Sequence, residues 1–350
     1  MTRRRRQLRL LAPAALLLVV ILLAALIASA ASGPSSPSGG LAARRAGAHS
    51  TSGTPPRPVA VTLRARRTGT LSAALEDAAT AALGQGRVVL LGGLDAEDTS
   101  TAVVTVLAPG SQGTSATDTG ARLPEPQHDA QAAALGGAVY VFGGGQVESY
   151  DHILRFDPGT GRVSLVGHLP QPASDVAVTS IGNTAYIVGG YNGERALDTI
   201  LAWRPGGNPT LVGHLPAGLR YAAVAAAGSK VIVAGGSTET GASRAILSFD
   251  PATGRVIQIG SLPHPLTHAS AASLGDVVYV IGGRGSAPSS QTAAILAIGS
   301  DSGRVQVAGA LAFPLSDAAV ATVGGRIVLA GGQSTTGTQS SIFELAPLPG

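Results

Sequence analysis

Residues 138–144 read Ala-Val-Tyr-Val-Phe-Gly-Gly, a short apolar run that ends on a pair of glycines. Five other apolar runs in the chain end in the same way. The six glycine pairs stand at 92–93, 143–144, 189–190, 235–236, 282–283 and 331–332, so successive pairs lie 51, 46, 46, 47 and 49 residues apart. A repeat of this length is typical of the blades of a β-propeller.

Each repeat keeps a fixed spacing around one residue, which we call the anchor. A Leu stands six residues before every anchor and a Gly seven residues after it, and the glycine pair begins fourteen residues after it, or fifteen in the first repeat. The central Gly opens turns such as Gly182-Asn183 and Gly275-Asp276, because two-residue hairpins need positive φ. The anchors are Asp77, Asp129, Asp175, Tyr221, His268 and Asp317.

The pattern predicts four strands in each repeat. A strand of small residues follows the anchor, a bulkier strand ends at the glycine pair, and two more flank a turn such as residues 157–161. The last repeat stops after its third strand, near residues 342–345, whereas residues 59–69 precede the first repeat in register with a fourth strand. We therefore expect an all-β, six-bladed propeller over residues 58–350, whose ring the N-terminal strand closes.

These residues resemble the Kelch-repeat family over roughly residues 58–350. The resemblance implies a propeller of six or seven blades, and the number of repeats implies six. The Trp typical of the fourth Kelch strand is replaced by Val163 and Val256, and the single Trp203 falls in a third strand, so the chain resembles a divergent, exported bacterial form. The matching pieces are the apolar-Tyr-apolar-apolar-Gly-Gly strands at Tyr140, Tyr186 and Tyr279 and the Asp-Pro-x-Thr-Gly turns at 157–161 and 250–254.

The first 30 residues predict either a signal peptide or a signal-anchor helix. Five arginines, at positions 3–6 and 9, precede nineteen residues without charge, and Ala28-Ser29-Ala30 resembles a cleavage site. The apolar run is also long enough to span a bilayer, which needs about 20 residues, so cleavage and transmembrane anchoring both stay open. Residues 31–57 are rich in Ser, Gly, Pro and Ala and predict a disordered linker. In both cases the propeller would be extracytoplasmic.

Composition excludes several classes of function. Residues 69–350 contain 13 basic and 20 acidic residues, a formal charge of −7, which argues against nucleic acid as a partner. The absence of Cys excludes disulfides and the Tyr–Cys cross-link of Kelch-like copper-radical oxidases. The chain has no glycine-rich phosphate loop, no His-Glu-x-x-His and no Gly-x-Ser-x-Gly. We assign no catalytic residue, no metal site and no cofactor.

Candidate ligand-binding residues gather on one predicted face. In a propeller blade, the loop before the first strand and the loop after the second open on the same side, so the anchors and the residues after the glycine pairs should share one rim. Carboxylates and imidazoles there could bind a cation or act as acid and base, and arginines could grip a carboxylate. The alternatives are that each anchor caps its own loop and that the loops are ordinary solvated surface. The candidates are the six anchors with Tyr191, Arg195, Arg220 and Arg284.

These features predict a non-catalytic, monomeric binding or protein-interaction module outside the cytoplasm. Its partner would be a protein or a cell-envelope glycan, and it would touch the membrane only through an uncleaved N-terminal helix. The alternative, suggested by some exported Kelch-like propellers that interconvert sialic acid anomers, is an enzyme acting on sugars or sugar acids at the channel mouth. A purely structural envelope protein is a third possibility. Fold resemblance does not choose among them.

Overall fold

The computed structural model describes residues 60–348. They belong to the second of the two units into which the chain divides, Pro56–Gly350. The predicted leader and linker, residues 1–57, lie outside the described residues. The regular secondary structure between residues 60 and 348 consists of β-strands alone, as predicted. This part of the chain contains no helix that is long and apolar enough to cross a membrane.

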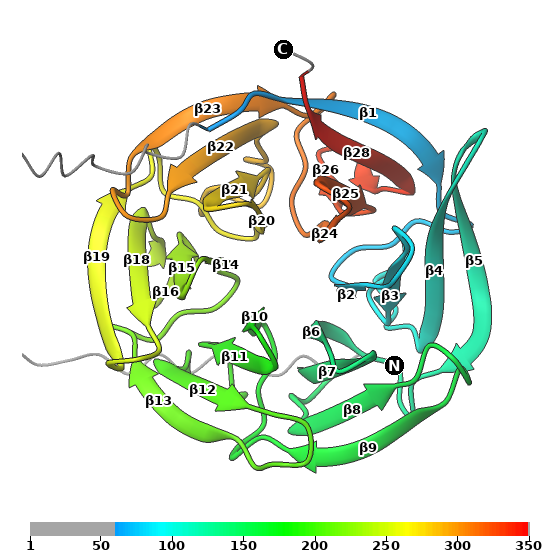
Figure 1. Ribbon diagram of the computed structural model, residues 1–350, viewed down its shortest axis with the longest axis horizontal. Coiled ribbons are helices and arrows are strands. Elements are labelled where there is room, and N and C mark those ends of the chain that lie inside the picture. Colours follow the sequence, from blue (N-terminus) through cyan, green and yellow to red (C-terminus); the bar gives the residue numbers. More distant parts are fainter. Residues whose placement is uncertain (1–59, 349–350) are drawn as a thin grey trace, which may run out of the picture. The chain divides into compact units, whose positions relative to one another are not determined.

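Four of the sheets have four antiparallel strands each, and in every one the successive strands are placed side by side from the centre of a ring to its rim (Figure 1). The first contains β6 (His128–Leu135), β7 (Ala138–Gly145), β8 (His152–Phe156) and β9 (Val163–His168). The second contains β10 (Ala177–Ile181), β11 (Thr184–Val188), β12 (Thr199–Trp203) and β13 (Thr210–His214). The third contains β14 (Ala223–Ala227), β15 (Lys230–Ala234), β18 (Ala245–Asp250) and β19 (Arg255–Ser261). The fourth contains β20 (Ser270–Leu274), β21 (Val277–Ile281), β22 (Ala294–Gly299) and β23 (Val305–Ala310).

An eight-stranded sheet joins the first and last repeats. One half is β2 (Ala79–Ala82), β3 (Val88–Leu91), β4 (Val103–Gly110) and β5 (Gly113–Arg122). The other half is β24 (Ala319–Val323), β25 (Arg326–Ala330), β28 (Ser341–Pro347) and β1 (Leu63–Thr70). Strand β1 pairs antiparallel with β28, so the N-terminal strand supplies the missing fourth strand of the last repeat, as predicted. A single parallel bridge between Gly69 and Thr114 then joins β1 to β5.

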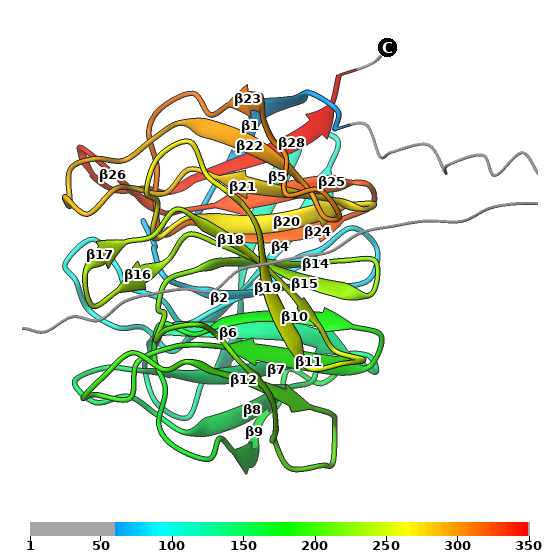
Figure 2. The same cartoon turned by 90° about the vertical axis from the view of Figure 1, so that its left-hand side faces the viewer.

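The first strands of the six repeats surround the axis. Each of them contacts the next, in the order β2, β6, β10, β14, β20, β24 and back to β2. Two short hairpins, β16 (Ser237–Thr238) with β17 (Gly241–Ala242) and β26 (Gln333–Ser334) with β27 (Gly337–Thr338), follow glycine pairs and project from one face of the ring (Figure 2). The ring of sheets makes the fold a β-propeller.

The glycine pairs join neighbouring repeats. The second glycine of each pair donates its N–H to a carbonyl two residues before the next anchor, as Gly144 does to Ala173 and Gly190 to Leu219, each at 2.9 Å. The same carbonyl lies against the first glycine, where any Cβ would collide with it. Because both glycines also have positive φ, no other residue fits this junction without strain. The repeat that reveals the fold therefore marks the contact that closes it.

The hydrophobic core lies between adjacent sheets. Trp203, at the end of β12, is 1% exposed and packs against Tyr140 and Phe142 of β7, with ring centroids 4.8 and 5.4 Å apart. Its indole N–H donates to the carbonyl of Gly207 at 2.9 Å. This aromatic cluster fills the interface between the second and third repeats with apolar surface.

Candidate functional site

The six anchors all have a left-handed backbone. Their φ values run from 51° at Asp77 to 57° at Asp317. Short polar side chains such as Asp tolerate this conformation better than other non-glycine residues, which explains why Asp recurs at the position. Tyr221 and His268 hold the same backbone with larger side chains, and strained residues of this kind collect at functional sites.

The anchor backbones form a closed ring of hydrogen bonds around the axis. Each anchor N–H donates to the carbonyl of the preceding anchor, from Asp129 to Asp77 and onward until Asp77 donates to Asp317, at distances of 2.9 to 3.2 Å. None of the anchor carboxylates in residues 60–348 accepts a hydrogen bond from the backbone N–H groups of its own loop, so the capping alternative is not supported; the bonds they accept come from the hydroxyls of Tyr221 and Ser316. The position recurs because the ring needs a left-handed residue there, which leaves the side chains free to face the channel.

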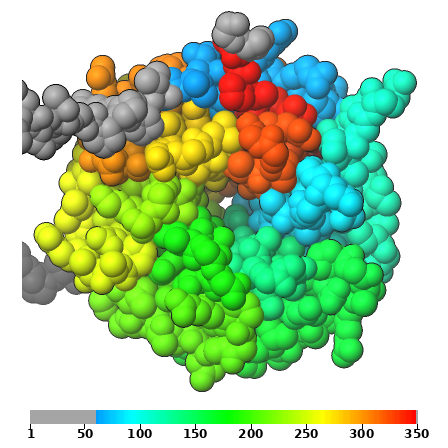
Figure 3. Space-filling view, in the orientation of Figure 1, coloured from blue at the N-terminus to red at the C-terminus, as the bar shows by residue number. Residues whose placement is uncertain are grey.

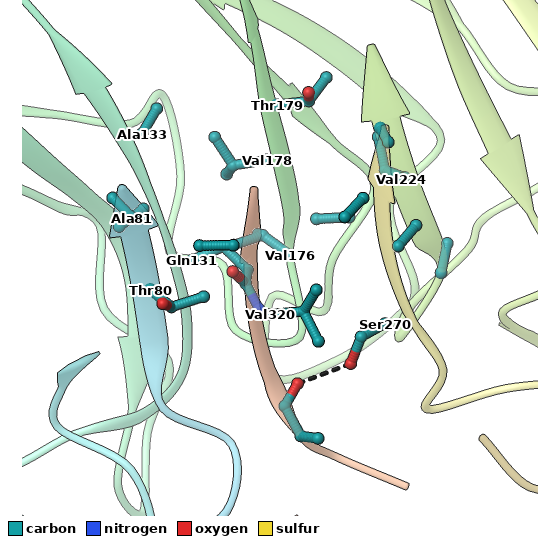
Figure 4. Close-up of a pocket in the computed structure, with 18 of the residues that line it drawn as sticks. Thr80, Ala81, Gln131, Ala133, Val176, Val178, Thr179, Val224, Ser270 and Val320 are labelled. Carbon is teal, nitrogen blue, oxygen red and sulfur yellow. Dashed lines mark hydrogen bonds between the residues drawn. The ribbon is translucent and has the colours of Figure 1, made fainter. Parts of the chain in front are cut away.

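All six anchor side chains line a central channel with a volume of about 440 Å³. A narrow opening is visible at the centre of the ring in Figure 3. Below the anchors the wall is built of small side chains from the inner strands, such as Thr80, Ala133, Val178 and Val320 (Figure 4). The wall also contains uncharged polar side chains, such as Gln131 and Ser270, whereas all the titratable groups of the channel lining are anchors.

A second cavity, of about 500 Å³, shares four anchors with the channel; we call it the vestibule. It extends over the loops of the fifth and sixth repeats, including the β26–β27 hairpin. This volume lies within the range of ligand pockets, about 300 to 1,000 Å³. Its lining consists of Glu76, Asp77, Tyr221, His268, Arg284, Pro288, Ser289, Gln291, Asp317, Gln333, Ser334, Thr335 and Gly337.

The residue before each anchor pairs with the residue after a glycine pair. Arg220 pairs with Ser237 and Thr267 with Arg284, through isolated β-bridges. The predicted shared rim is therefore built by backbone pairing, and it places Arg284 beside the anchor His268. Glu76 stands directly before the anchor Asp77, and Gln333 stands directly after the glycine pair at 331–332, so both belong to this rim. Neither was among the candidates named from the sequence.

Arg220 is committed to a structural ion pair. Its Nε lies 2.5 Å from Oδ2 of Asp175, whose side chain is almost fully buried. The guanidinium also stacks over the rings of Tyr191 and Tyr221, 4.5 and 4.7 Å from their centroids. Tyr221 donates its hydroxyl to Oδ2 of Asp129 at 3.2 Å. With its charge balanced and its plane covered, Arg220 orders the anchors and is not free to grip a ligand carboxylate.

His268 is held as a neutral imidazole. Burial, with help from the charge of Arg284, lowers its pKa from 6.5 to about 3. Arg284 donates from Nη2 to Nε2 of His268 at 3.0 Å, so the imidazole proton is on Nδ1, which faces Oγ1 of Thr267 at the same distance. The ring stacks on Tyr221 at 3.7 Å between centroids. These contacts fix the tautomer and the orientation of the histidine.

Glu76 and several of the anchor Asp residues have raised pKa values. Burial raises the pKa of Glu76 to about 7, and the charges of Asp317 and Asp98 add to the shift while the Thr338 hydroxyl opposes it. Burial likewise raises the pKa of Asp317 to about 6. It raises the pKa values of Asp77 and Asp129 well above the ordinary range, with neighbouring carboxylates as the second cause. Groups that titrate near neutral pH in a cleft are typical of binding and catalytic sites.

The structure brings together nine of the ten candidates named from the sequence. The six anchors line the channel, Tyr191 and Arg220 pack beside them, and Arg284 lines the vestibule. Arg195 is exposed and lines neither cavity. Although four anchors are Asp, the described residues contain no group of three acidic or His side chains that could hold a metal ion.

Comparisons with known proteins agree with this geometry. The Kelch motif family model matches residues 172–208, which run from the loop before the anchor Asp175 into the turn after Trp203. This segment is therefore similar to a Kelch motif. Among solved structures, that of YjhT is similar, with a TM-score of 0.67 and 16% sequence identity over 79% of this chain and 96% of that one. At this identity the likeness concerns the fold. A search of curated protein sequences finds no significant match.

Proposed function

We propose that this Kelch-like propeller is a non-catalytic binding module that receives its ligand in the vestibule. The supporting observation is that a cavity of about 500 Å³ opens on a rigid ring and gathers Glu76, Asp317 and Arg284 around the fixed imidazole of His268. Rigid walls with a few oriented polar groups suit recognition, because little ordering is needed when the ligand binds. Counting the eight-stranded sheet as two halves, we infer six blades.

The proposal includes the cellular setting. The leader predicted at residues 1–30 supports an extracytoplasmic module, anchored in the membrane or secreted, and the linker at 31–57 would separate it from the bilayer. The acidic charge of the folded part favours a protein or envelope-glycan partner over nucleic acid. We propose that the protein acts as a monomer. Cell fractionation with an antibody to the propeller tests the location, and recovery in the cytosol would contradict it.

Thermal unfolding of the full chain tests vestibule binding. We expect a saturable rise in Tm with at least one member of a panel of neutral sugars, sugar acids, amino sugars and short peptides, because a ligand that binds only the folded state stabilises it. Arg284→Gln should remove the rise, whereas Arg304→Gln, on an exposed turn, should retain it. A rise that survives Arg284→Gln unchanged would place binding elsewhere.

An enzyme acting on sugars or sugar acids is the second candidate. Its support is the carboxyl group of Glu76, whose pKa of about 7 lets it exchange protons near neutral pH, as acid–base catalysis needs. Exchange NMR of N-acetylneuraminic acid anomers tests it. Faster exchange with the protein, lost in Glu76→Gln, would support the enzyme, and an unchanged rate would count against it.

A further inference from the structure

Three buried oxygen atoms in the lining of the vestibule have no hydrogen-bond partner within 3.5 Å. They are Oε2 of Glu76, Oε1 of Gln291 and Oε1 of Gln333. Glu76 is only 7% exposed, so water has little access to its carboxyl group. Buried polar atoms are nearly always paired in folded proteins, and three exceptions in the lining of one cavity call for an explanation.

The amide orientations make these atoms acceptors. Gln291 donates from Nε2 to the carbonyl of Pro288 at 2.8 Å, which turns its Oε1 away from that bond. Gln333 directs Nε2 toward Oε1 of Glu76 at 3.5 Å, and its own Oε1 is also without a hydrogen-bond partner. The unsatisfied groups of the vestibule therefore need a hydrogen-bond donor with more than one N–H or O–H.

Above about pH 7 the ionised carboxyl groups of the vestibule outnumber its cations. Glu76 and Asp317, with pKa values of about 7 and about 6, are then both negative, whereas the lining contains the single guanidinium of Arg284, which is already bound to His268. The charge of Asp98 also acts on Glu76. Within residues 60–348, no group of three His, Asp or Glu side chains is placed to hold a metal ion. An ammonium group carries both the positive charge and three N–H donors.

We propose that the vestibule recognises a primary ammonium group, with Glu76, Gln291 and Gln333 as its acceptors. The inference rests on the proposed binding function and specifies the ligand class for the same cavity. The ammonium group could belong to an amino sugar or to a lysine side chain, and both offer the same chemistry to Glu76. Arg284, which also lines the vestibule, repels a second positive charge and so favours ligands with a single amine.

Isothermal titration of the full chain with matched probes tests the proposal. Glucosamine and Nα-acetyl-lysine amide carry the amine, glucose and N-acetylglucosamine lack the charge, and glucuronate reverses it. We expect binding of one or both amines and none of the uncharged sugars. Glu76→Gln should weaken amine binding about tenfold or more, as loss of a charged hydrogen bond does, whereas Glu239→Gln, exposed on the β16–β17 turn, should not change it.

The pH dependence provides a second readout. A bound ammonium group favours the ionised form of Glu76 and Asp317. With Nα-acetyl-lysine amide, whose amine stays protonated over this range, binding should therefore release protons and strengthen as pH rises from about 5.5 to about 8. Titrations in two buffers of different ionisation enthalpy measure that release. An affinity that falls with rising pH over this range would overturn the assignment of these carboxyl groups to the site.

The remaining outcomes separate the two proposals. Binding of glucuronate or of uncharged sugars without the amines would overturn the ammonium class and leave the vestibule function standing. Amine binding that is unaffected by Glu76→Gln would also overturn it. No binding by any probe would contradict the ammonium class, and the wider thermal panel would then decide whether the vestibule binds anything. A response to one amine alone supports the proposal and identifies its source.

Discussion

Replacing Asp317 with Asn should make the protein more stable at alkaline pH and leave it nearly unchanged in acid. The pKa of this carboxyl group is raised from 3.8 to about 6, chiefly by burial, so the folded protein binds its proton more tightly than the unfolded chain. The stabilisation this proton provides is complete below pH 3.8 and is lost as pH rises through 6. A shift of about two pH units corresponds to about 3 kcal/mol. Asn stays neutral and tolerates the left-handed backbone at φ 57°.

Urea unfolding at pH 4, 6 and 8 measures the effect, with the emission of Trp203, the only Trp in the chain, as the probe. At pH 8 the variant should exceed the wild type by up to about 3 kcal/mol, and at pH 4 the two should agree within about 1 kcal/mol. Asp276→Asn, on an exposed hairpin turn, is the matched control and should leave the pH dependence as it is. A variant that is destabilised equally at all three pH values would refute the reasoning, because it would mean that Asp317 is held as an ionised, stabilising group.

Three further predictions concern the ring itself. Gly189→Ala should lower the free energy of unfolding by well over the roughly 1–2 kcal/mol that a left-handed backbone costs, because the new Cβ meets the carbonyl of Leu219. Gly182→Ala, with φ 59° and open space around the Cβ, should cost only that backbone amount. Equal losses in urea unfolding would contradict the close contact at the glycine pair. Trp203→Ala should cost about 3–5 kcal/mol by emptying the core between two sheets, and a loss below about 1 kcal/mol by calorimetry would argue against its packing. Deleting residues 60–70 should expose the edge of β28 and cause aggregation, visible by size-exclusion chromatography; a stable monomer would show that β1 is dispensable.

The architecture could be predicted because the repeated contact uses residues that are rare in strands. A glycine pair at the end of an apolar run, such as Gly143-Gly144, marks a junction at which only glycine fits, and the junction recurs in each repeat. The incomplete last repeat and the early strand at residues 63–70 likewise indicated closure, because one strand was missing at one end and one was in excess at the other. Both the junction and the closure could be predicted from the spacing of residues along the chain.

The candidate site was predicted less completely. Recurrence pointed to the anchors, but the spacing alone could not separate a capping carboxylate from one that faces a channel, because both need Asp before a strand. Glu76 and Gln333 were missed since neither position recurs as a residue type. The signal that could have found them is the pairing of the residue before the anchor with the residue after the glycine pair. Arg195 and Arg220 were both named, and only the three-dimensional contacts showed that one is exposed and the other committed to Asp175.

The sequence by itself determined the repeat, the strand order within each repeat, the β-propeller and the strand that closes it, because these depend on spacing and on residues with special backbone freedom. Only the tertiary structure decided the chemistry at the mouth. The raised pKa values of Glu76 and Asp317, the fixed tautomer of His268 and the unpaired oxygens of the vestibule come from burial and from neighbours many residues away in the chain. Desolvation and charge interactions act through space, so no local pattern in the sequence records them.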